Sequence, residues 1–245
     1  MKFVLRKIGT WFYDRLSHIA LIGAWLIACY IFLWKNKVKI VGRENLPHTT
    51  NILYVSNHLT WIDSFLIGVS VMNFWEMFFY FKCIPWNAAD RKNFFTHPVW
   101  KHFFALLKNI PVDRGSGNRD AVKELVRNFE KVLIDSNLLL FFEGTRSRTG
   151  FIGPCISGVS ETIRLVKPKY VIPIFLDWGV QSIMPIADGP RYSAIHSGKT
   201  GQVIIGKAID FSGIDMSKHG SARKNISALV RQAVVNLQNQ NSSSK

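Results

Sequence analysis

The chain has 245 residues, of which 48% are hydrophobic and 19% are charged, and this excludes an intrinsically disordered protein. Its 31 lysines and arginines outnumber 16 acidic residues, and the net charge of +15 attracts polyanions: nucleic acid, anionic lipid, acidic small molecules or carrier proteins. The dispersed cysteines Cys29, Cys83 and Cys155 argue against a disulfide framework and a zinc site. We therefore expect an α/β protein in a reducing environment with no metal.

The N-terminal segment is the most hydrophobic part of the chain. Ile19 to Trp34 form a run of 16 residues without a charge, slightly short of the ~20 that span a bilayer. The mixed aromatic and basic residues before it are typical of a helix in the lipid interface. Basic residues flank both ends of the run, so a re-entrant hairpin fits as well as one span. A buried core helix is the alternative, but we expect residues 1–36 to anchor the protein to a membrane.

The following elements alternate between strands and helices. In chain order we expect a strand at Val38–Val41, a strand at Ile52–Ser56, a helix at Ile62–Met72, a helix at Val99–Leu107, a strand at Ile110–Val112, a helix at Asn118–Ser136, strands at Leu138–Phe142, Val171–Leu176 and Val203–Ile205, and a helix across Ile226–Leu237. This order predicts an α/β fold with a central, largely buried sheet flanked by helices over residues 37–240. A disordered tail is expected at 241–245.

An aromatic block from Phe74 to Trp86 has two interpretations. It is consistent with a buried strand and its flanks, which we favour, and also with one wall of a lipid-binding groove.

Three short polar segments follow predicted strands, where open α/β sheets bind their ligands. The first, Ser56 to Asp63, contains His58 and Asp63. A histidine accepts a proton at neutral pH when a carboxylate on its other nitrogen fixes the tautomer. Residues five apart on one helix point about 140° apart, so His58 must lie in a loop, with Thr60 as the N-cap of the next helix. The alternative is an ordinary turn histidine beside a first-turn aspartate.

The other two polar segments contain arginines. Asn109 to Gly115 includes Asp113 and Arg114, and Phe141 to Gly150 includes Arg146. Guanidinium groups near glycines and hydroxyls suit bidentate contacts with a phosphate. Each segment by itself is also consistent with an ordinary charged surface.

Taken together, the motifs resemble those of the glycerolipid acyltransferase family, whose best-known members are 1-acyl-glycerol-3-phosphate acyltransferases. The family pattern is NHxxxxD, an I-D-R element, F-P-E-G-T-R-S and a V-I-P element. The corresponding segments here, in the same order, are Asn57-His58 to Asp63, Val112-Asp113-Arg114, Phe141 to Ser147, and Val171-Ile172-Pro173. The resemblance covers most of the chain, from Val38 to Ile205.

The resemblance implies a role for each matching residue. His58 would be the general base and Asp63 its orienting partner. The residues implied to hold the acceptor's glycerol phosphate are Arg114 and the turn Glu143, Gly144, Thr145 and Arg146, and Pro173 would border the acyl-donor site. A thiolate leaving group needs little acid assistance, so no cofactor beyond the acyl-CoA or acyl carrier protein co-substrate is expected.

Four positions depart from the family pattern. Phe142 replaces the proline of the third motif, and Pro111 stands where phenylalanine is usual in the second. Lys108 occupies a usual glycine position, and Ile156 lies where a lysine is often found. The departures concern the acceptor side more than the catalytic pair.

The expected function is therefore O-acyl transfer to a lysophospholipid hydroxyl, by default that of 1-acyl-glycerol-3-phosphate, which gives phosphatidic acid. One alternative is the same chemistry on another acceptor, such as a lyso-aminolipid. A second is a non-catalytic, basic, membrane-tethered binding protein. Nucleic-acid binding is disfavoured because the basic residues are dispersed without an aromatic-basic motif. The expected location is an anionic membrane surface, with the catalytic domain on the cytoplasmic face.

Overall fold

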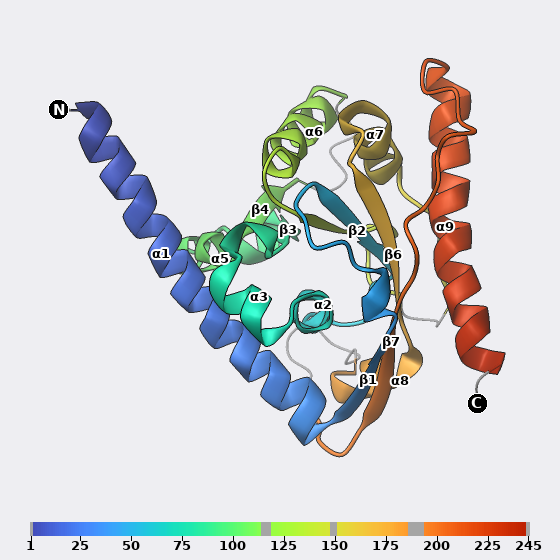
Figure 1. Ribbon diagram of the computed structural model, residues 1–245, viewed down its shortest axis with the longest axis horizontal. Coiled ribbons are helices and arrows are strands. Elements are labelled where there is room, and N and C mark those ends of the chain that lie inside the picture. Colours follow the sequence, from blue (N-terminus) through green and yellow to red (C-terminus); the bar gives the residue numbers. More distant parts are fainter. Residues whose placement is uncertain (1, 114–118, 148–150, 186–193, 244–245) are drawn as a thin grey trace.

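The computed structural model describes residues 2–113, 119–147, 151–185 and 194–243 (Figure 1). The strands in this part of the chain are β1 (Lys37–Val41), β2 (Ile52–Ser56), β3 (Trp86–Asp90), β4 (Asn109–Val112), β5 (Leu138–Phe141), β6 (Tyr170–Leu176) and β7 (Thr200–Ile205). The α-helices are α1 (Lys2–Cys29), α2 (Asp63–Val71), α3 (Phe74–Phe79), α4 (Arg91–Phe94), α5 (Trp100–Leu106), α6 (Arg119–Leu133), α7 (Ser157–Val166), α8 (Trp178–Ile183) and α9 (His219–Ser243).

The strands form one mixed sheet in the order β1-β7-β6-β2-β5-β3-β4. Strands β6, β2, β5, β3 and β4 are parallel to one another, whereas β7 runs antiparallel to β6 and pairs in parallel with β1. The carboxyl ends of the five parallel strands therefore meet at one edge of the sheet. The loops that follow β2, β4 and β5 carry the first three sequence motifs, so the topology brings these motifs to that edge.

Helices cover both faces of the sheet (Figure 1). Successive side chains of β2 alternate between the faces, as the period of a strand requires. Ile52 and Tyr54 pack with α1, α2 and α3, whereas Leu53 and Val55 pack with α6, α7 and α9. The continuous burial of β2 confirms the predicted α/β fold with a sheet covered on both sides.

The N-terminal segment forms one long helix. Helix α1 continues without a break into a π-helix, η1 (Tyr30–Lys35). By length and composition alone, Trp11–Lys35 is the one helix of the described residues that could cross a membrane. The re-entrant hairpin considered for this segment is therefore wrong, because the chain does not reverse within it.

The aromatic block after α2 is helical, so the favoured strand interpretation is wrong over most of its length. Asn73 accepts a hydrogen bond from the backbone of Glu76, and the Glu76 carboxylate accepts one from the backbone of Asn73. This capping box starts α3 and overrides the strand preference of its aromatic residues. A 3-10 turn, η3 (Phe81–Cys83), follows, and strand β3 begins only at Trp86.

The closing helix is longer than the expected Ile226–Leu237. Helix α9 runs from His219 to Ser243, and Asn241 is buried within it. The tail predicted to be disordered from 241 is thus helical as far as Ser243.

Candidate active site

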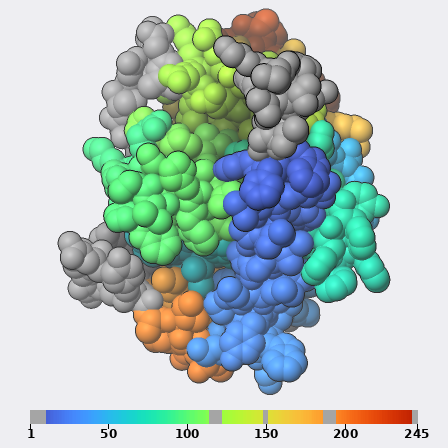
Figure 2. Space-filling model, turned by 90° about the vertical axis from the view of Figure 1, so that its left-hand side faces the viewer, coloured from blue at the N-terminus to red at the C-terminus, as the bar shows by residue number. Residues whose placement is uncertain are grey.

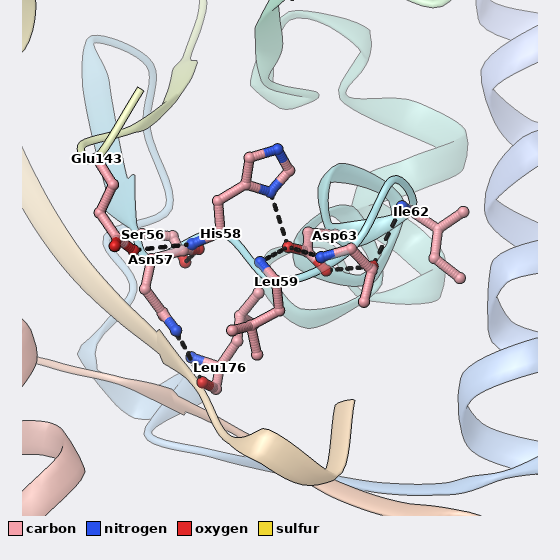
Figure 3. Close-up of polar contacts among 9 residues, drawn as sticks. Ser56, Asn57, His58, Leu59, Ile62, Asp63, Glu143 and Leu176 are labelled. Atoms are coloured by element: carbon pink, nitrogen blue, oxygen red, sulfur yellow. Dashed lines mark hydrogen bonds and ion pairs between the residues drawn. The ribbon is translucent and has the colours of Figure 1, made fainter. Parts of the chain in front are cut away.

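His58 lies in the loop between β2 and α2, as its predicted pairing with Asp63 requires. Its Nδ1 is 2.8 Å from Asp63 Oδ2 (Figure 3). The Asp63 side chain is fully buried, whereas the His58 side chain keeps 13% of its surface exposed. Helix α2 begins at Asp63, so the carboxylate returns from the first helical turn towards the loop. The predicted N-cap is wrong, because the residue at that position is Ile62 and not Thr60.

Thr60 instead contributes to a network around the Asp63 carboxylate. Asp63 Oδ2 accepts backbone hydrogen bonds from Leu59 at 2.5 Å and Thr60 at 2.8 Å, and Oδ1 accepts one from the Thr60 hydroxyl at 2.5 Å. Several donors satisfy this buried charge at once, which offsets the cost of removing it from water. The network fixes the carboxylate against His58 Nδ1.

The pair leaves the other ring nitrogen of His58 available for chemistry. An ionised carboxylate accepts hydrogen bonds only, so Nδ1 carries the proton and Nε2 is the acceptor in the neutral ring. Figure 3 shows Nε2 pointing away from Asp63. The imidazole also stacks on Phe141 at the end of β5, with 3.9 Å between centroids and 11° between planes. This arrangement gives a base with one tautomer and one orientation.

Asn57, the first residue of the motif, has a structural contact that sequence reasoning did not assign. Its Nδ2 donates to the Leu176 carbonyl at 2.9 Å, and its Oδ1 accepts from the Leu176 backbone at 2.8 Å. The side chain thereby joins the loop to the end of β6. The asparagine beside the histidine was visible in the sequence. Its partner was not, because Leu176 lies 119 residues away.

The loop after β5 supports the loop of His58. Glu143 Oε1 accepts from the backbone N–H of His58 at 3.3 Å, and Oε2 accepts from that of Gly153 at 2.8 Å. Gly144 adopts a φ of +71°, which favours glycine. Thr145 is exposed, and none of Glu143, Gly144 and Thr145 is among the described residues that line the cavity beside His58. Binding of the acceptor by these three residues stays a prediction that the geometry does not favour.

Arg146 is the member of this turn that reaches the cavity. Its guanidinium carbon lies 4.3 Å from the centroid of the Trp61 ring, and both side chains line the cavity together with His58. A guanidinium on an aromatic face is oriented by cation–π attraction. Trp61 lay inside the first motif, yet sequence reasoning gave it no role.

The second motif is described only in part. Asp113 accepts a hydrogen bond from Arg91 Nε at 3.0 Å, which links the end of β4 to α4. Arg114, the predicted phosphate ligand, lies outside the described residues.

Pro173 does not reach the cavity. It is buried in β6, opposite Val55 of β2, and its carbonyl accepts from the backbone of Gly206 at 2.9 Å. Its place beside the acyl-donor site stays a prediction.

The cavity has a volume of about 280 Å³ and extends from His58 between the sheet and α1, α2, α4 and α5. Most of its wall is apolar or aromatic. Representative lining residues are Leu21, Ala24, Phe65, Met77, Ile84 and Phe104. Hydrophobic side chains predominate in the wall, and His58 and Arg146 are among its polar members. Such a wall is typical of a site that binds an apolar ligand and orients it through a few polar groups. Within the described residues no group of three His, Cys, Asp or Glu side chains could hold a metal ion.

A sequence profile described as "Acyltransferase" matches residues 37–177, more than half of the chain. The chain belongs to the acyltransferase family. The matched segment extends from the first strand to the end of β6 and contains all the predicted site residues, so the motif resemblance seen in the sequence is confirmed at the level of the family.

Two curated members of the family show the extent of the similarity. The chain is 30% identical over 175 residues to a chloroplastic 1-acyl-sn-glycerol-3-phosphate acyltransferase of Brassica napus, covering 71% of this chain and 46% of that protein. It is 28% identical to one of Arabidopsis thaliana, covering 71% and 44%. The chain thus spans about half the length of these relatives.

A solved structure shares the fold. The crystal structure of the 1-acyl-sn-glycerophosphate acyltransferase PlsC from Thermotoga maritima superposes with a TM-score of 0.63 at 21% identity. The similarity covers 89% of this chain and 79% of PlsC. The similarity thus supports the overall fold of this chain.

Proposed function

We propose that this protein transfers a fatty-acyl group from a thioester to the hydroxyl of a lysophospholipid. The observation that carries the proposal is the 2.8 Å contact between His58 Nδ1 and Asp63, with the imidazole in the wall of an apolar cavity. A histidine oriented in this way is suited to general-base catalysis. Family membership supports the same reaction class.

The proposed reaction needs one proton to be taken up and returned by His58. His58 Nε2 takes the proton of the acceptor hydroxyl as its oxygen attacks the thioester carbonyl. Asp63 stabilises the imidazolium formed in this step. When the tetrahedral intermediate collapses, the C–S bond breaks, the ester remains, and the thiolate leaves. The imidazolium then returns its proton to the thiolate, which regenerates neutral His58. No covalent acyl-enzyme is needed.

The acceptor of the proposal is 1-acyl-glycerol-3-phosphate. Arg146 lies in the cavity wall with His58 and is held by the Trp61 ring, so it can contact a phosphate while the hydroxyl reaches His58. Arg114 is its expected companion. The names of the two plant relatives agree with this acceptor. The acyl chain of the donor, acyl-CoA or acyl carrier protein, would occupy the apolar part of the cavity.

An acceptor and donor panel tests the proposal. With the purified protein, lysophosphatidic acid and an acyl-CoA should give thiol release and phosphatidic acid. Lysophosphatidylcholine and a lyso-aminolipid serve as competing acceptors, and acyl carrier protein as the alternative donor. Faster turnover of the lyso-aminolipid would reassign the acceptor. Absence of thiol release with every combination would refute acyl transfer.

The proposal also places the protein at a membrane surface, with α1 lying along it. Ser17 donates to the carbonyl of Leu106 at 2.5 Å, and Leu21 and Phe32 are buried against the domain. A spanning helix needs about 20 residues within hydrocarbon. Part of Trp11–Lys35 packs on the α/β domain, with 28% of its most apolar window buried, so one side of the helix faces the protein and the other faces lipid.

The lipid-facing surface of the proposal combines three helices. Figure 2 shows α1 in blue along this face, with green and teal segments of the chain on its two sides. Large hydrophobic side chains are exposed on α1, α3 and α5. They include Ile19, Ile27, Trp75, Phe79, Trp100 and Phe103. So much exposed apolar surface is rare on a soluble monomer and marks a membrane or protein contact. The net charge of +15 favours an anionic, cytoplasmic-side surface.

Vesicle sedimentation tests the membrane contact without removing the cavity wall that α1 provides. Ile27 is 62% exposed on α1, so Ile27→Glu should weaken binding to anionic vesicles about ten-fold or more, because a carboxylate resists transfer from water. Ile134→Glu is the matched control, since Ile134 is 73% exposed just after α6. Equal binding by both variants would contradict the assignment of this face.

A further inference from the structure

The backbone of His58 is linked by hydrogen bonds to a helix on the opposite face of the sheet. Glu143 accepts from the backbone N–H of His58 at 3.3 Å and from that of Gly153 at 2.8 Å. On α9, Arg231 donates from Nε to the Gly153 carbonyl and from Nη2 to the Ile152 carbonyl, both at 3.1 Å. Four hydrogen bonds thus form a continuous path from α9 to the loop of the proposed base.

The middle of this path leaves little freedom. A Cβ atom on Gly153 would lie 2.9 Å from Glu143 Oε2, so a side chain at this position would require the carboxylate to shift. Burial raises the pKa of Glu143, while the hydrogen bonds from Gly153 and His58, and the charges of His58 and Arg231, lower it. Each of these partners therefore helps to keep the carboxylate ionised and able to accept both N–H groups.

The end of the path on α9 is firmly placed. Ile226, Val230 and Val234 are fully buried in the core on that side of the sheet, and they fix the helix around Arg231. A planar guanidinium presents several donors in a fixed arrangement and can bridge two neighbouring carbonyls. Ile152 is itself buried, so the bridged segment is held both by packing and by the arginine.

We propose that Arg231 is a positioning residue for acyl transfer, which holds the Ile152–Gly153 segment so that Glu143 keeps the backbone of His58 in place. This inference rests on the proposed function of His58 as the base. Arg231 itself contacts neither the imidazole nor the cavity wall, so it acts only through Gly153 and Glu143. Its loss should slow the chemical step and leave binding of the acceptor nearly unchanged.

A double-mutant cycle on the full chain tests the inference, with hexadecanoyl-CoA and lysophosphatidic acid as substrates. Arg231→Ala and Glu143→Ala should each lower kcat roughly five- to thirty-fold, because small misplacements of a catalytic group are costly. The acceptor KM should change less than about two-fold. Because the two residues act in series, the double variant should be within about two-fold of Glu143→Ala alone. A merely stabilising arginine would not produce this coupling.

Two further variants complete the test. Arg223→Ala removes an exposed arginine from the same helix and should keep the wild-type kcat. Arg231→Lys keeps the charge but not the two-carbonyl bridge, should give an intermediate kcat, and replaces Arg231→Ala if that variant does not fold. An unchanged kcat in Arg231→Ala would overturn the inference. So would a double variant whose loss of kcat equals the product of the two single losses. In either case, turnover by the wild-type protein would still support the proposed function. A wild-type protein without turnover in every donor and acceptor combination would overturn both.

Discussion

The loops that follow β2 and β5 lie side by side but are held in different ways. In the first loop, His58 and Asp63 are five residues apart, and the donors to the carboxylate come from the residues between them. In the second, Glu143 reaches back 85 residues to the backbone of His58 and forward to Gly153. Contacts within the first loop thus form the His58–Asp63 pair, whereas Glu143 in the second loop gains its role only from contacts made by the fold.

This difference separates two kinds of functional residue. A pair within one loop is a short sequence motif whose chemistry can be recognised before the fold is known. A supporting carboxylate can be recognised as part of a motif, but its partner cannot, because that partner depends on which strands are neighbours. The comparison predicts that substitutions in the first loop reduce kcat most. Substitutions in the second loop should affect either acceptor binding or the positioning of His58.

The largest effect is expected for the first loop. His58→Ala removes the base, so kcat should fall by at least ~10²–10⁴, the range typical of general-base catalysis. Thiol release from an acyl-CoA with lysophosphatidic acid is the measurement. His102→Ala, which removes an exposed histidine on α5, is the control. Wild-type turnover of His58→Ala would eliminate the proposed mechanism.

A smaller and different effect is expected for the cavity end of the second loop. Arg146→Ala should raise the acceptor KM about ten-fold, since a charge-assisted contact with phosphate is lost, and should lower kcat much less. Saturation curves for lysophosphatidic acid measure both constants. Arg127→Ala removes an exposed arginine on α6 and controls for net charge. An unchanged acceptor KM would remove Arg146 from phosphate binding.

The smallest effect on catalysis, with a measurable effect on stability, is expected at Lys108, which belongs to neither loop. Its Nζ donates to the carbonyls of Phe81 and Ile84, and burial lowers its pKa from 10.5 to about 7. Between pH 7 and 10.5 the unfolded chain binds a proton that the folded chain does not. The unfolding free energy should therefore rise with pH across this window, by an amount on the order of a few kcal/mol.

Lys108→Met tests the predicted rise of the unfolding free energy with pH. The variant should lose this pH dependence and gain most stability, relative to wild type, at or below pH 7, where the buried ammonium is charged. Urea unfolding between pH 6 and pH 9.5 measures the difference. Parallel pH curves for the two proteins would mean that the burial of Lys108 does not control its proton.

The sequence by itself indicated the α/β class and part of the alternation of strands and helices, and it identified His58 and Asp63. Buried strands such as Ile52–Ser56 and the helix over Asn118–Ser136 were readable because their hydrophobic patterns have clear periods. Strand β3 was missed because its residues, from Trp86 to Asp90, are only partly buried and form no regular pattern. Helix α3 was misread because local capping outweighed aromatic strand preference.

Only the tertiary structure decided which partners each motif residue meets. Asn57 bonds to Leu176, Glu143 supports His58 and Gly153, and Arg146 stacks on Trp61. These contacts depend on the strand order β6-β2-β5, which no local pattern encodes. The physical reason is that periodicity and capping act within a few residues of the chain, whereas neighbours across a parallel sheet are set by the packing of the whole domain.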